Sequence, residues 1–116
     1  MKSLFLLLLA LTVQAQEKTV LLLEVSRHGA REPLQLFNLT KNPNANFNGS
    51  GNLTPLGKKE HFELGALIRQ KYSSQAGFIP AEFNLEDIFV ESSDTNRTYL
   101  SSMYQLMGMF PDNYPS

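Results

Sequence analysis

The sequence contains no cysteine. Disulfide bonds and thiolate metal sites are therefore excluded, although small secreted domains usually depend on disulfides for stability. The 116 residues must then supply an adequate apolar core or belong to a larger domain. The formal net charge of −1 gives no electrostatic footprint of nucleic-acid binding. No apolar run reaches the roughly 20 residues that a membrane-spanning helix needs.

The first 15 residues have the pattern of a cleaved secretory signal. Lys2 provides the positive start, residues 4–13 form the apolar core, and residues 13–15 (Val-Gln-Ala) resemble a cleavage site. We therefore predict a signal peptide over 1–15, entry into the secretory pathway, and no membrane association after cleavage. An uncleaved anchor is the alternative interpretation, and the short apolar core argues against it.

Four Asn-x-Ser/Thr sequons occur in the sequence, and in a secreted chain they are potential glycosylation sites. The sequons at Asn38 and Asn48 are the favoured sites. The other two sequons are less favoured, because Asn52 is closely followed by Pro55 and Asn96 lies beside a candidate site residue. The sequence thus predicts a glycoprotein.

Two apolar segments predict β-strands. Residues 19–25 form a nearly continuous apolar run, which is typical of a strand buried on both faces of a parallel sheet. A short buried helix is the alternative for this run. Residues 88–90 (Ile-Phe-Val) predict a second, shorter strand. Between the two segments, the Asn-rich stretch 38–52 has no apolar period and predicts an exposed loop.

Two helices are also predicted. Thr54 is a suitable N-cap and Pro55 fits the first helical position, so a helix should begin here and end near residue 73. One face of this helix is marked by residues at steps of four and three: Gly57, His61, Leu64, Ile68 and Tyr72. A second helix is predicted over 96–109. The resulting order of strand, loop, helix, strand and helix predicts a layered α/β domain with a mainly parallel sheet.

The residues that suggest chemistry come directly after the first predicted strand. His28 lies between Arg27 and Arg31 in the sequence. A guanidinium group fits phosphate oxygens two at a time, and a neutral imidazole can attack phosphorus. Asp94 and Arg97 come after the second predicted strand. Because ligands gather at the carboxyl ends of parallel strands, we expect these side chains to face one edge of the sheet, with Asp94 capping a helix or orienting an arginine.

Three segments resemble the histidine acid phosphatase branch of the histidine phosphatase superfamily. Residues 27–33 (Arg-His-Gly-Ala-Arg-Glu-Pro) fit the family pattern R-H-G-x-R-x-P. Residues 53–65 are similar to L-T-x-x-G-x-x-Q-x-x-x-L-G, and residues 92–98 are similar to S-T-D-x-x-R-T. The first pattern is highly specific, the second is mostly structural, and the third is strong in this context.

The resemblance implies an acid phosphatase that hydrolyses phosphate monoesters through a phosphohistidine. His28 would be the nucleophile, Arg27, Arg31 and Arg97 would bind the phosphate, and Asp94 would support the site. The substrate would be a small-molecule phosphomonoester, with no cofactor and no metal ion. The implied location is extracellular or lysosomal. The implied fold is the N-terminal part, over residues 16–116, of a phosphoglycerate-mutase-like α/β domain that is apparently truncated.

The sequence also departs from the family pattern. The family commonly has Arg at the position of Glu91, Gln at Glu60 and Asp at Asn96, and Glu91 would lower the local positive potential. Family members carry a second histidine later in the chain, followed by an acidic residue that donates a proton to the leaving alcohol. This pair is not in the 116 residues. A catalytically incomplete, vestigial phosphate-binding chain and a phytase-like phosphatase therefore remain alternatives. His61 is interpreted as a packing or surface residue.

Overall fold

A computed structural model describes four parts of the chain, namely residues 17–37, residue 47, residues 49–73 and residues 77–113. The predicted signal peptide over 1–15 and the favoured glycosylation sites at Asn38 and Asn48 lie outside these described residues. Within the described ranges, neither helix combines the length and the apolar character needed to cross a membrane.

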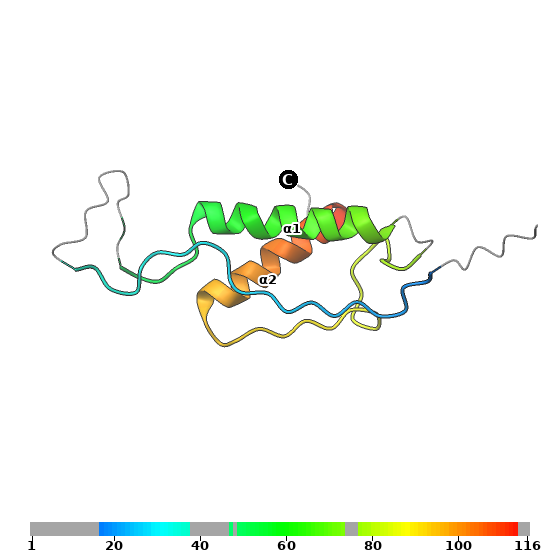
Figure 1. Cartoon of the computed structure of the whole chain (residues 1–116), viewed down its shortest axis with the longest axis horizontal. Helices are drawn as coiled ribbons and strands as arrows, with labels where there is room; N and C mark the ends of the chain where they lie inside the picture. Colours follow the sequence, from blue (N-terminus) through cyan, green and yellow to red (C-terminus); the bar gives the residue numbers. More distant parts are fainter. Residues whose placement is uncertain (1–16, 38–46, 48, 74–76, 114–116) are drawn as a thin grey trace, which may run out of the picture.

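Both predicted helices are confirmed, and they pack against each other (Figure 1). Helix α1 spans Pro55–Ser73 and helix α2 spans Asn96–Met109, followed by the short 3-10 helix η1 at Pro111–Asn113. Helix α1 begins where it does because the Thr54 hydroxyl accepts a hydrogen bond from the Gly57 N–H over 3.1 Å. Helix α2 has Thr95 rather than Asp94 as its N-cap residue.

The two helices approach closely because two glycines lie at their contact. A Cβ atom added to Gly65 would overlap the backbone carbonyl of Gln105, and one added to Gly108 would overlap the backbone carbonyl of Phe62. Both glycines are buried. The backbones of the two helices are therefore in direct contact. This close packing fixes how the side chains of one helix lie relative to those of the other.

A small aromatic core closes the end of the helix pair where α2 stops. Phe110 is fully buried and meets the ring of Phe83 edge-on at 5.7 Å between centroids. The Arg69 guanidinium lies 5.8 Å from the centre of the Phe110 ring. Arg69 also donates a hydrogen bond of 2.8 Å to the carbonyl of Met109, in the last turn of α2, where a cation is favourable.

The prediction of a mainly parallel sheet is wrong for the residues that the structure describes. Residues 17–29 and 88–93 are extended and run lengthwise along the helix pair, but neither segment forms a β-strand (Figure 1). Over the described ranges, β-pairing is limited to one isolated antiparallel bridge between Arg31 and Leu53.

The physical reason is that no neighbouring strand lies against either extended segment within the described ranges. Both extended segments line one open cleft of about 1600 Å³, together with residues of the two helices. The two segments therefore face this cleft and do not pair with each other. A strand forms only when its backbone groups pair with another extended segment. The apolar side chains of the first segment are correspondingly exposed rather than buried, with Val20 at 83% and Val25 at 92% of full exposure.

Candidate active site

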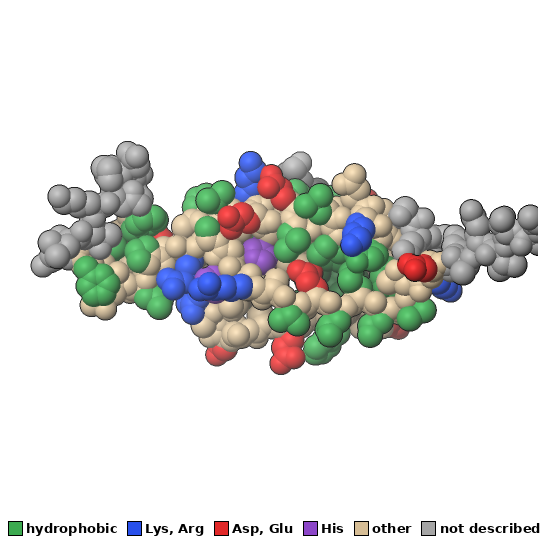
Figure 2. Space-filling model, in the orientation of Figure 1, with side chains coloured by type: hydrophobic (Ala, Val, Ile, Leu, Met, Phe, Trp, Pro, Cys, Tyr) green, Lys and Arg blue, Asp and Glu red, His purple; other side chains and the backbone are tan. Residues whose placement is uncertain are grey.

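An open recess brings three of the predicted site residues together. It is lined by Arg27 and His28, at the end of the first extended segment, and by Arg31, which follows that segment. Glu60 from α1 and Phe47 complete its wall. Figure 2 shows basic side chains gathered beside a histidine near one end of the helix pair. The recess therefore combines an imidazole with two guanidinium groups, which is the combination expected for binding a phosphate group.

The imidazole of His28 is held in one tautomer. Its Nδ1 atom lies 2.8 Å from the backbone carbonyl oxygen of Gly29. A carbonyl oxygen only accepts hydrogen bonds, so Nδ1 carries the proton of this contact. In the neutral ring the lone pair is then on Nε2. The geometry thus leaves Nε2 as the ring atom that can act as a nucleophile.

The guanidinium groups differ in their surroundings. Arg27 is exposed, whereas Arg31 is half-buried and donates a hydrogen bond of 2.8 Å to the carbonyl of Glu32. Arg97, in the first turn of α2, is half-buried, and its Nε atom is buried without a hydrogen-bond partner among the described residues. Among the described residues, no carboxylate lies within ion-pair distance of these three arginines. None of the three guanidinium groups therefore forms an ion pair with a described carboxylate, although the Glu60 carboxylate lines the same recess as Arg27 and Arg31.

Arg97 and Asp94 are not brought into the recess itself. Neither residue lines it, and Asp94 is exposed. Arg97 lies near Gly51 instead, where its Nη1 atom would be 3.9 Å from a Cβ atom placed on that glycine. It is linked to the loop that carries His28 through Ser101, whose hydroxyl donates to the Arg97 carbonyl over 2.7 Å and accepts from the Gly29 N–H over 3.1 Å.

The loop that carries His28 rests on the first turns of α1. Both the N–H and the hydroxyl of Thr54 donate to the Ala30 carbonyl, over 2.9 and 2.8 Å. The Ala30 N–H in turn donates to a carboxylate oxygen of Glu60 over 2.9 Å. Gly57 leaves the space for this contact, because a Cβ atom there would overlap the Ala30 carbonyl. The start of α1 therefore positions the loop.

Sequence analysis did not identify Glu60, His61 and Ser101 as residues of this neighbourhood. Glu60 and His61 come three and four positions after Gly57, the spacing of neighbours on one helix face, and Ser101 comes four positions after Arg97. That spacing was the available signal. No group of three histidine, aspartate or glutamate side chains converges as a metal site within the described part of the chain.

Comparison with known proteins identifies the class of protein to which these features belong. The family model of the histidine phosphatase superfamily (branch 2) matches residues 21–116. The chain belongs to this superfamily, as its three sequence segments indicated.

Individual relatives are acid phosphatases by name. The chain is 36% identical to human (Homo sapiens) prostatic acid phosphatase over 88 residues, which cover 75% of this chain and 22% of the relative. It is 36% identical to the mouse (Mus musculus) prostatic enzyme over 111 residues, or 92% of this chain and 28% of the relative. It is 36% identical to human lysosomal acid phosphatase over 90 residues, or 75% and 20%. The chain thus spans 20–28% of the length of these relatives.

Proposed function

We propose that the protein is a histidine acid phosphatase that hydrolyses phosphate monoesters through a phosphohistidine on His28. The observation that carries this proposal is the His28 imidazole, fixed with its proton on Nδ1, beside Arg27 and Arg31 in one recess. Membership of the superfamily and the acid phosphatase names of its relatives support the same reaction.

The chemistry is determined by the tautomer. The Nε2 lone pair of His28 attacks phosphorus, the bond from phosphorus to the ester oxygen breaks, and the leaving oxygen takes a proton from water, since the acidic proton donor of the family is not among the 116 residues. Water then attacks the phosphohistidine, releasing inorganic phosphate and restoring the imidazole. Arg27 and Arg31 hold the negative oxygens as charge develops in the transition state.

Arg97 is proposed as the third phosphate ligand. Its buried Nε–H has no partner within the described part of the chain, and leaving a buried donor unpaired costs about 1–3 kcal/mol. A phosphate oxygen that reached it would remove this cost. Asp94 is proposed as a supporting residue near the start of α2, although it is exposed and lies outside the recess.

The proposed site of action is the secretory pathway, with an extracellular or lysosomal destination. The support is the signal-like pattern over 1–15, the four sequons and the names of the prostatic and lysosomal relatives. Residues 16–116 would then be the N-terminal part of the phosphatase domain, and the substrate a small-molecule phosphomonoester.

The test is hydrolysis of p-nitrophenyl phosphate at acidic pH by the protein expressed from its native transcript. We expect turnover by the wild type, none by His28→Ala, and an acid-labile phosphohistidine after brief reaction with labelled substrate. Lys59→Ala is the control, because Lys59 is 70% exposed on α1 and makes only a surface ion pair with Glu63. Phosphate binding without turnover by the wild type would favour the vestigial phosphate-binding alternative. Turnover that survives His28→Ala would disprove the nucleophile assignment.

A further inference from the structure

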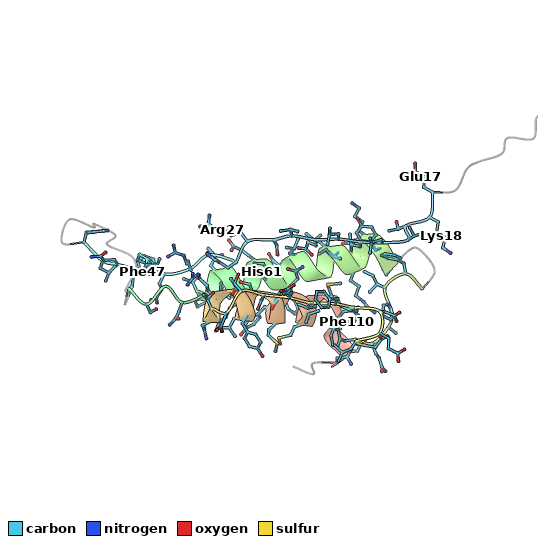
Figure 3. All side chains as sticks on the ribbon, turned by 90° about the horizontal axis from the view of Figure 1, so that it is seen from below. Glu17, Lys18, Arg27, Phe47, His61 and Phe110 are labelled. Carbon is cyan, nitrogen blue, oxygen red and sulfur yellow. The ribbon has the colours of Figure 1, made fainter. Side chains whose placement is uncertain are left out.

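His61 is the one described histidine outside the recess, and it is buried behind the loop. Only 5% of its surface is exposed. Figure 3 shows it between the extended segment and the helices, whereas Arg27 lies on the outer side of that segment. A polar ring in such a position must make hydrogen bonds, because burying it without partners is costly.

Both ring nitrogens of His61 face oxygen atoms. Nε2 lies 3.1 Å from the backbone carbonyl oxygen of Arg27, and Nδ1 lies 3.1 Å from the side-chain oxygen of Gln105 on α2. The Arg27 carbonyl only accepts, so Nε2 must donate to it. The Gln105 amide donates in turn to the carboxylate of Glu24 on the extended segment. The Gln105 oxygen also only accepts, so its contact with Nδ1 is a hydrogen bond only when Nδ1 carries a proton as well. The bond that fixes the ring is therefore the one from Nε2 to the Arg27 carbonyl.

The bond to Arg27 matters because its carbonyl belongs to the peptide unit that leads into His28. That unit also contains the backbone nitrogen of His28, and a peptide unit is rigid and planar. A hydrogen bond that holds the carbonyl oxygen therefore also fixes the orientation of the His28 backbone nitrogen at the end of the extended segment. Ser101 and Glu60 hold the next two N–H groups, of Gly29 and Ala30, but among the described residues His61 alone holds the peptide directly before His28.

We propose that His61 is a positioning residue for the nucleophile, acting through a hydrogen bond from its Nε2 to the Arg27 carbonyl. This inference rests on the proposed role of His28. It assigns His61 more than the packing role that the sequence suggests. Packing alone would require only a side chain of similar volume, whereas positioning requires a donor at the place of Nε2.

Two amide substitutions separate these roles. The amide nitrogen of glutamine can occupy about the place of histidine Nε2, and that of asparagine about the place of Nδ1. His61→Gln therefore keeps a donor for the Arg27 carbonyl and loses the contact with Gln105. His61→Asn keeps a partner for Gln105 and leaves the Arg27 carbonyl without its donor. Both variants retain a polar, uncharged side chain in the helix.

The first measurement is steady-state hydrolysis of p-nitrophenyl phosphate by the complete protein. We expect His61→Asn to lower kcat by about 10- to 100-fold with a smaller change in KM, since a displacement of about 1 Å at a reacting group can cost about 100-fold. His61→Gln should stay within about threefold of the wild type. Equal kcat values for the two variants, whether high or low, would overturn the proposal.

The second measurement does not depend on activity. Hydrogen exchange at the Gly29 and Ala30 amides reports how firmly the loop is held. We expect exchange at least about 10-fold faster in His61→Asn than in the wild type, and wild-type exchange in His61→Gln. If the wild type hydrolyses no substrate, the proposed function fails, and this comparison still decides the role of His61. Identical exchange in the two variants would overturn it.

Discussion

Gly57 is the position at which a single methyl group should disturb the site most selectively. A Cβ atom at this residue would overlap the Ala30 carbonyl and lie 2.7 Å from the Ala30 nitrogen. Ordinary van der Waals contact begins near 3.4 Å, so the contact with the nitrogen alone would require the loop to move by about 0.7 Å, and the overlap with the carbonyl oxygen requires a larger movement. His28 is two residues away on that loop. Gly57→Ala should therefore lower kcat/KM by about 10- to 100-fold.

The free energy of unfolding of Gly57→Ala should fall by no more than about 2 kcal/mol. Overpacking typically costs about 1–3 kcal/mol, while replacing glycine by alanine within a helix contributes about 1 kcal/mol of stability. The assays are p-nitrophenyl phosphate hydrolysis and urea unfolding. Leu56→Ala is the control, because Leu56 is the preceding residue of α1 and is 60% exposed. Wild-type kcat/KM in Gly57→Ala would refute the argument that α1 sets the position of the loop.

Three further changes test the electrostatics and the packing. Glu60→Gln removes a negative charge from the recess and keeps an acceptor for the Ala30 N–H. Inorganic phosphate should then inhibit hydrolysis about fivefold more strongly, equivalent to about 1 kcal/mol of binding free energy. The control Glu63→Gln should leave this inhibition unchanged. Arg97→Lys keeps the charge and loses the buried Nε donor, so KM should rise about 10-fold without loss of stability in thermal unfolding. Arg69→Ala removes the cation over the Phe110 ring and a hydrogen bond to the end of α2. It should lower the free energy of unfolding by about 2 kcal/mol in a urea titration and leave kcat unchanged.

The helices could be predicted because the signals that define them are local. A helix makes its backbone hydrogen bonds within its own segment, so the Thr54 cap and the spacing of its inward face were sufficient to define α1. Gly57 and His61 of the predicted stripe are buried, and its other members are half-buried. The third buried residue of α1, Gly65, was not part of the predicted stripe. The sheet could not be predicted in this way. An apolar run such as 19–25 favours an extended backbone, but a strand also needs a partner that its own sequence does not specify.

The same difference applies to the candidate site. Arg27, His28 and Arg31 are close in sequence, so a short loop brings them to one recess, although the helices hold that loop in place. Arg97 belongs to another element, and its position depends on how α2 packs, which is why it lies beside the loop and not in the recess.

The residues that hold the loop were the hardest to find from sequence, because their side chains act on backbone groups. A backbone carbonyl or N–H has no identity in the sequence, so nothing in it marks the Arg27 carbonyl as the partner of His61. The close contact of α1 with α2 places His61 and Ser101 against successive peptides of the loop. Packing between the helices thereby determines the position of the imidazole. A substitution at the helix contact, such as Gly108→Ala, should therefore alter the site even though the added Cβ atom would meet Phe62 and Ala66, which do not line the recess.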